Sequence, residues 1–161
     1  MIGNDIIDLA LARKESNWKR KGFLEKLFTP LEQKFIWQAD DAEIMIWNLW
    51  SRKEAAYKIY NRQTKIRAFI PKQLECLGCS TIDGYGKVTV YGNVYYTKTE
   101  VTSEYIYSTA VVYPEDFNHI QTVNAIDVAK DINGFPFHHQ NNNPVSKTHH
   151  GRFEKYIQIK C

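Results

Sequence analysis

The sequence predicts an α+β protein in which a long central helix packs on an antiparallel sheet. Residues 43–62 carry apolar and helix-favouring side chains at helical spacing, and neither Gly nor Pro interrupts them. Between residues 71 and 113 the chain changes to β-branched and aromatic residues separated by turn residues. A length of 161 residues fits one domain, expected to span residues 1–161, and 43% hydrophobic residues can fill its core.

The N-terminal residues 1–9 form a short apolar run, which predicts a buried strand. The run contains Asp5, and a carboxylate in such surroundings must be paired, hydrogen-bonded or bound to a metal ion. The ordinary role of Asp8, close behind it, is the N-cap of the next helix. That next helix is predicted over residues 9–18, and Gly22 is expected to end it.

The clearest local signal follows at Thr29, where Thr, Pro, Leu and Glu are consecutive. Thr at the N-cap, Pro at the first helical position and Glu32 two residues later make a capping box. We therefore predict a helix that begins there and runs to about Gln38. After a loop that contains Asp40 and Asp41, the central helix begins.

One stripe of the central helix is half aromatic and half charged. At 3.6 residues per turn it contains Trp47, Trp50, Glu54, Lys58 and Asn61. The ordinary interpretation is a surface Glu–Lys pair four residues apart, which adds a few tenths of a kcal/mol. The alternative is a carboxylate that binds a metal ion, with a lysine one turn later that contacts phosphate.

The β-rich part of the chain predicts an antiparallel meander. We expect strands at residues 87–91, 94–97 and 105–113, with Gly and Asn in the turns, and a last strand at residues 156–160. Residues 119–130 fit either a strand or an amphipathic helix. The tyrosines of the meander are expected to pack on the sheet, because the acidic charge around them would repel a nucleic-acid backbone.

Composition and charge narrow the classes of protein. No apolar run approaches the roughly 18 residues of a membrane span, and no signal peptide is recognisable, so we expect a cytoplasmic protein. The three cysteines, Cys76, Cys79 and Cys161, suit a reducing compartment. Cys76 and Cys79 lack the second ligand pair of a zinc site and the βαβ context of a redox motif.

The net charge of +3 is unevenly distributed. Residues 13–35 hold seven Lys or Arg against three Glu, and residues 52–67 hold six against one. Residues 75–127 hold seven Asp or Glu against two Lys. Such a field steers an anionic partner toward one face, which leaves a basic module that binds nucleic acid or another polyanion as an alternative function.

Three blocks of the sequence together resemble the 4′-phosphopantetheinyl transferase superfamily. They are I-G-N-D-I-I-D-L at residues 2–9, W-S-R-K-E-A-A-Y-K at residues 50–58 and V-S-K-T-H-H at residues 145–150. Their order is similar to that of the small holo-acyl-carrier-protein synthase branch. The resemblance implies a transferase that moves 4′-phosphopantetheine from coenzyme A to a serine of an acidic carrier protein, with release of 3′,5′-ADP.

The resemblance also assigns roles to residues. Asp5 and Glu54 match the acidic positions that bind Mg²⁺, and oxygen ligands of this kind suit that ion. Asp8 matches an acidic position of the family less consistently and is a secondary candidate. Lys58 matches the lysine expected at the pyrophosphate, and either Glu54 or a metal-held water is the expected base. Ser146 and His149 fall on the Ser-x-Thr-His block and are expected to contact coenzyme A.

Charge alone adds three candidates for the phosphates of coenzyme A. Arg62, Lys65 and Arg67 follow the acidic position closely in the sequence, and guanidinium and ammonium groups suit phosphate. Solvated loop charges are the alternative interpretation.

Two positions depart from the family pattern. Phe135 stands where a Gly-Lys-Pro segment has its lysine, and Lys147 stands where a hydrophobic residue is usual. Because of these departures, an alternative function stays open: the chain could be a non-catalytic family member that acts as a scaffold. The family contains trimers of single units and monomers of two fused units. This chain is long for the former and short for the latter, so a homo-oligomer (trimer) and a monomer both stay open.

Overall fold

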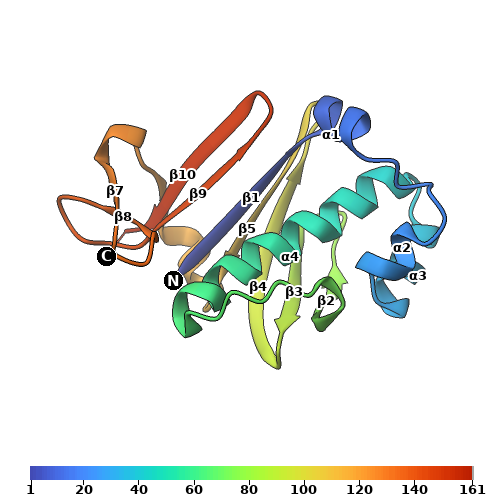
Figure 1. Cartoon of the computed structure of the whole chain (residues 1–161), viewed down its shortest axis with the longest axis horizontal. Helices are drawn as coiled ribbons and strands as arrows, with labels where there is room; N and C mark the ends of the chain where they lie inside the picture. The colour runs from blue at the N-terminus through green and yellow to red at the C-terminus, as the bar shows by residue number, and fades with distance from the viewer. Residues whose placement is uncertain (161) are drawn as a thin grey trace.

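The computed structural model describes residues 1–160, so Cys161 lies outside the described residues. It confirms the predicted α+β architecture: helix α4 (Ala42–Thr64) lies across one face of a five-stranded antiparallel sheet (Figure 1). The strands of this sheet are arranged in the order β1 (Ile2–Asp8), β5 (Tyr105–Val111), β4 (Asn93–Val101), β3 (Tyr85–Val90) and β2 (Leu74–Cys79). None of the helices within residues 1–160 has the length and apolar character needed to span a lipid bilayer.

The C-terminal part of the chain forms two small sheets beside β1. One contains β6 (Ile120–Thr122), β10 (Phe153–Ile159) and β9 (Val145–His150), and the other contains β7 (Val128–Lys130) and β8 (Pro136–His138). Figure 1 shows these strands on the side of β1 that lies away from helices α2 and α3. Residues 119–130, expected as one strand or one helix, instead form two short strands and a 3₁₀ turn (Ala125–Asp127).

Helix α4 approaches β1 very closely because two small residues meet there. A Cβ atom at Gly3 would overlap the carbonyl oxygen of Ala55, and Ala55 is completely buried. Since side chains alternate along a strand, Asp5 lies on the same face of β1 as Gly3 and also faces α4. The Gly-x-Asp and Lys-Glu-Ala segments therefore act together: the small residues bring the backbones close, and the acidic residues follow.

The remaining helices, α1 (Leu9–Glu15), α2 (Phe23–Leu27) and α3 (Pro30–Gln38), lie toward the N-terminal end of α4. Asp8 caps α1 by accepting hydrogen bonds from the backbone N–H groups of residues 10 and 11, as predicted. The capping box of Thr29 and Glu32 is also present. The role predicted for Gly22 was wrong, because α1 ends at Glu15 and Gly22, with a φ of 83°, is the N-cap of α2.

Candidate active site

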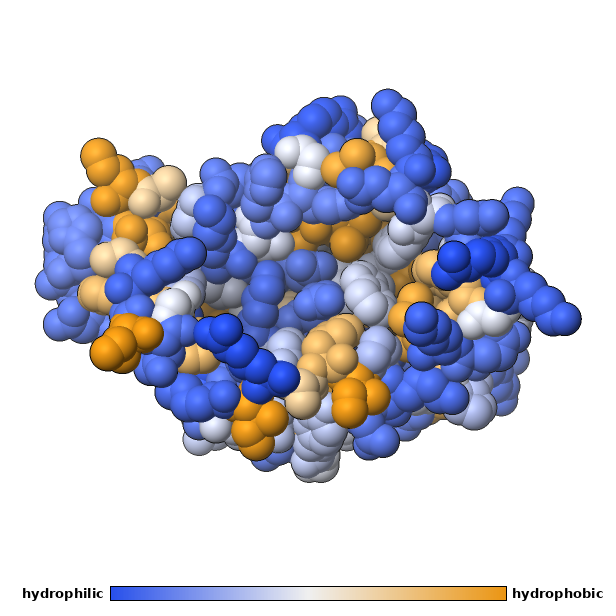
Figure 2. All heavy atoms as spheres, viewed as in Figure 1, coloured by the Kyte–Doolittle hydropathy of each residue, from blue (hydrophilic) through white to orange (hydrophobic). Residues whose placement is uncertain are grey.

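A pocket of about 650 Å³ lies between α4, β1 and β9. All five residues of the mixed stripe on α4 line it: Trp47, Trp50, Glu54, Lys58 and Asn61. Figure 2 shows the hollow on this face of the molecule, with hydrophilic and hydrophobic side chains both present in it. Its volume is in the usual range for pockets that bind small molecules.

Strand β9, which forms the wall of the pocket opposite α4, is joined to β1 by side-chain hydrogen bonds rather than by backbone pairing. The N–H groups of Asn4, Ile6 and Asp8 point away from β5 and donate to side chains of β9. The acceptors are Ser146 Oγ at 2.9 Å, Thr148 Oγ1 at 3.1 Å and His150 Nδ1 at 2.8 Å. Each bond joins residues 142 positions apart in the sequence. The backbone N–H groups on the outer edge of β1 thus have hydrogen-bond acceptors although no strand backbone pairs with that edge.

Asp8 and Arg152 close one end of this junction. The Asp8 carboxylate accepts hydrogen bonds from the Arg152 side chain at 3.0 and 3.1 Å and from its backbone N–H at 3.0 Å. These bonds to Arg152 hold the pKa of Asp8 well below its usual range. Asp8 is thus occupied with capping and with Arg152, so its more ordinary interpretation accounts for its contacts.

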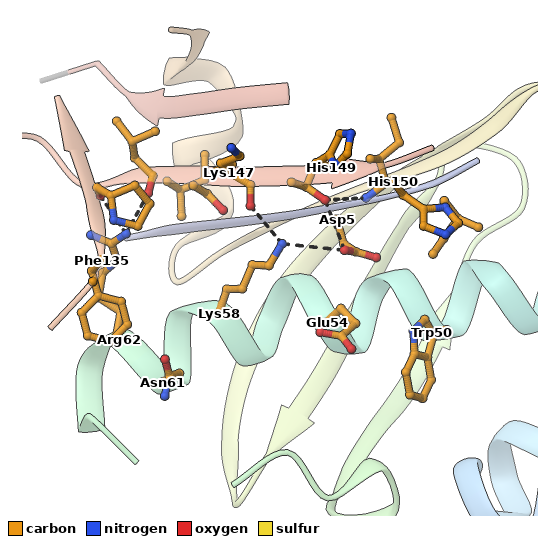
Figure 3. A pocket seen from close by; sticks show the side chains of 18 of the residues that line it. Asp5, Trp50, Glu54, Lys58, Asn61, Arg62, Phe135, Lys147, His149 and His150 are labelled. Carbon is orange, nitrogen blue, oxygen red and sulfur yellow. Dashed lines mark hydrogen bonds and ion pairs between the residues drawn. The ribbon is translucent and has the colours of Figure 1, made fainter. Parts of the chain in front are cut away.

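Lys58 connects the helix to both walls of the pocket. Its ammonium donates to the carbonyl oxygen of Asn4 at 2.6 Å and to that of Lys147 at 3.1 Å, and it lies 3.7 Å from Asp5 Oδ1 (Figure 3). The Lys58 side chain is still 33% exposed. Its ammonium group therefore lies in the pocket and links β1 to β9 through these two carbonyl oxygens.

Asp5 has an incomplete set of partners. Its Oδ1 atom accepts a hydrogen bond from Thr148 Oγ1 at 3.3 Å, whereas its Oδ2 atom is buried and has no hydrogen-bond partner in the described part of the chain. Burial, and the nearby Glu54 carboxyl group, raise the pKa of Asp5 to about 7 against the opposing effect of Lys58. Burial also raises the pKa of Glu54. The carboxyl groups of Asp5 and Glu54 are thus close enough to interact, and burial disfavours the charged form of each.

This donor set fits Mg²⁺. An unsatisfied carboxylate oxygen and a second carboxylate provide hard oxygen ligands, and Mg²⁺ commonly takes one or two carboxylates and completes its shell with water and phosphate oxygens. Within residues 1–160 no group of three or more His, Cys, Asp or Glu side chains is placed to hold a metal ion. Asp5 and Glu54 are the residues that could hold the ion on the protein side.

The other predicted ligand residues divide between the pocket and its surroundings. Arg62 lines the pocket and donates to the carbonyl oxygens of Pro136 and Val145 at 2.9 and 2.7 Å. Lys65 and Arg67 are not among the lining residues: the Lys65 ammonium lies on the Phe135 ring, and Arg67 donates to the Asn133 carbonyl oxygen at 2.9 Å.

Ser146 and His149 both line the pocket but differ in exposure. Ser146 is 3% exposed, and its hydroxyl donates to Asn4 Oδ1 at 2.7 Å, so its present contacts are structural. His149 is exposed and points away from the β1 junction, as the strand alternation requires. The sequence analysis did not predict the role of His150, which accepts a hydrogen bond from β1. The signal was present, because residues 146, 148 and 150 all have side chains that form hydrogen bonds, and alternate residues of a strand face the same side.

We expect Asp5→Asn to change the pH dependence of stability. A carboxyl group whose pKa rises from 3.8 in the unfolded chain to about 7 in the fold destabilises the fold progressively as pH increases from about 4 to 7. Asparagine cannot ionise, so the variant should gain about 2–4 kcal/mol relative to wild type between pH 5 and pH 8. Urea denaturation in metal-free buffer at the two pH values measures this gain. Parallel stability curves for the two proteins would contradict it.

The partly buried carboxyl groups of Asp5 and Glu54 line one pocket with the Lys58 ammonium and the Arg62 guanidinium. Such a combination of groups suits a phosphate-bearing ligand. Residues 1–110 match the family model of the 4′-phosphopantetheinyl transferase superfamily, and the chain belongs to that superfamily. The matched range includes Asp5, Glu54 and Lys58 but not β8, β9 or β10. None of the curated proteins compared with the chain matches it. Membership supports phosphopantetheine transfer as the general class of activity.

Proposed function

We propose that this protein transfers the 4′-phosphopantetheine group of coenzyme A to a serine of an acyl carrier protein or a related acidic carrier domain. The reaction would depend on Mg²⁺ and release 3′,5′-ADP, as in a holo-acyl-carrier-protein synthase. The observation that carries the proposal is the shared pocket of Asp5, Glu54 and Lys58, in which one Asp5 carboxylate oxygen has no hydrogen-bond partner among residues 1–160. Bound Mg²⁺ supplies charge neutralisation at the pyrophosphate, a contribution of several kcal/mol.

The residues of the pocket have distinct roles in this proposal. Asp5 and Glu54 hold the metal ion from β1 and α4. Lys58 and Arg62, both cationic and on the same helix, stabilise the negative charge on the pyrophosphate and on the leaving 3′,5′-ADP. In the reaction the serine oxygen forms a bond to the phosphorus atom of the phosphopantetheine, and the bond to 3′,5′-ADP breaks.

The serine must also lose its proton. Either Glu54 or a water held by the metal ion would take this proton, and burial raises the pKa of Glu54 in the metal-free protein. The basic residues 13–35 provide a surface for an acidic carrier protein, and attraction over this distance weakens as salt increases. We place the reaction in the cytoplasm, where coenzyme A and carrier proteins meet.

The direct test is incubation of the full chain with coenzyme A, Mg²⁺ and a panel of apo-carrier proteins. Mass spectrometry should show addition of the phosphopantetheine group to one serine of a carrier, and chelation of Mg²⁺ should prevent it. Binding of random DNA or RNA without Mg²⁺, combined with no modification of any carrier, would instead support a polyanion-binding module.

We expect His149→Ala to weaken the binding of coenzyme A by about tenfold or more, as is typical for loss of a hydrogen bond to a charged group. His149 is exposed at the pocket, so the variant should keep the stability of the wild type. Isothermal titration calorimetry measures the affinity, and thermal unfolding measures the stability. His139→Ala is a suitable control, because His139 is also exposed and does not line the pocket. An unchanged affinity for coenzyme A would leave His149 without a ligand role.

A further inference from the structure

An aromatic ring occupies the cationic end of the pocket. Phe135 is half-buried and lines the pocket near Arg62, at the end opposite Trp50 (Figure 3). Its backbone is fixed, because the Asp131 carboxylate accepts hydrogen bonds from the N–H groups of Asn133 and Phe135 at 2.8 and 2.9 Å. The ring is thus held on a rigid turn at the place where phosphate groups are expected.

Two cations contact this ring in different ways. The Arg62 guanidinium carbon lies 5.3 Å from the ring centroid, and two carbonyl oxygens hold the guanidinium in place. The Lys65 ammonium lies 4.2 Å from the centroid, but Lys65 is exposed and its long side chain can move. An exposed cation on an aromatic face contributes little to stability, so a flat ligand can displace it.

We propose that Phe135 is a stacking platform for the purine ring of the nucleotide that binds in this pocket. The inference depends on the proposed function, because it assigns one end of the same pocket to the adenine of coenzyme A. Every nucleobase has a π face, and stacking on an aromatic side chain commonly improves affinity by roughly tenfold. The displaced Lys65 ammonium, together with Arg62, would then lie beside the phosphates attached to the ribose.

This role explains the position better than a purely structural one. A phenylalanine that only closed the turn would need no access to the pocket, whereas Phe135 lines it. Phe137, two residues later in β8, is also half-buried but is not a lining residue. The two residues therefore make a matched pair in which only the first can contact a ligand.

The test compares two ligands that differ only in the base. Calorimetry with 3′,5′-ADP and with ribose 3,5-bisphosphate should show that the wild type binds the base-bearing ligand at least about tenfold more tightly. Phe135→Leu should lose this preference and bind the base-free ligand within about twofold of the wild type. Phe135→Trp should keep the preference, and Phe137→Leu should behave as the wild type does.

The possible outcomes separate the inference from the proposed function. If Phe135→Leu keeps the preference while coenzyme A still supports carrier modification, the stacking role is wrong and the function stands. Equal weakening of both ligands by Phe135→Leu would show a structural role and would also overturn the inference. If the wild type binds neither coenzyme A nor 3′,5′-ADP, both proposals fail.

Discussion

Glu54→Gln should lower carrier-protein modification by about 10³-fold or more while the protein remains folded. Glutamine keeps the size of the side chain but removes the charge that a divalent cation requires, and it cannot accept a proton. The metal contribution alone is several kcal/mol, and each 1.4 kcal/mol corresponds to a tenfold change in rate. The measurement is the initial rate of phosphopantetheine transfer at saturating coenzyme A and Mg²⁺.

A stability measurement distinguishes loss of the reaction from unfolding of the Glu54→Gln variant. Burial raises the pKa of Glu54, which means that the fold disfavours its charged form, so the neutral variant should be at least as stable as the wild type at pH 8. Glu43→Gln is the matched control, because Glu43 lies on the same helix but pairs with Arg13 at 3.1 Å outside the pocket. Normal turnover by Glu54→Gln would remove Glu54 from the reaction.

The elements predicted correctly from the sequence are those with strong local signals. The uninterrupted helix α4, the capping box of Thr29 and the apolar strand β1 each depend on residues within a few positions of one another. Strand β2 was not predicted, because its sequence L-E-C-L-G-C has no β-branched residue and its register shifts between Cys76 and Gly78. Its place in the sheet comes from pairing with β3 and from burial of Leu74 and Cys76 on the core.

The candidate site, too, was predictable only where the signal is local in the sequence. Spacing along one helix was enough to place Trp47, Trp50, Glu54, Lys58 and Asn61 in one pocket. The partners of this stripe could not be derived from spacing, because the β1–β9 junction joins residues 142 positions apart. Nearness in sequence was also a poor guide for Lys65 and Arg67. Helix α4 ends at Thr64, and these two residues beyond its end do not line the pocket.

A buried ion pair links the site helix to the rest of the fold. Lys53, adjacent to Glu54, donates to Glu32 Oε2 at 2.8 Å, and both side chains are completely buried. The same oxygen accepts the N–H of Thr29 at 3.0 Å, and Glu32 Oε1 accepts the N–H of Cys76 at 2.8 Å. One carboxylate thus joins α3, α4 and β2, and each of its three partners is a donor.

Glu32→Gln should therefore destabilise the protein by about 3–5 kcal/mol, the usual cost of removing one partner of a buried ion pair. A carboxamide has only one acceptor oxygen, so at least one of the three donors faces an NH₂ group, and Lys53 loses its counter-charge. For a chain of this size the loss corresponds to a decrease in melting temperature of roughly 6–20 °C. Calorimetric and urea unfolding measure both quantities.

The matched comparison is Glu154→Gln. Glu154 pairs with Lys147 at nearly the same distance, 2.9 Å, but both side chains are more than 40% exposed. Water screens that pair, so its loss should change stability far less than Glu32→Gln does. The double variant Glu32→Gln/Lys53→Met, which removes both buried charges, should be more stable than the sum of the single variants predicts. Equal losses from Glu32→Gln and Glu154→Gln would mean that burial of the Glu32–Lys53 pair does not hold α4, and with it Glu54 and Lys58, in position.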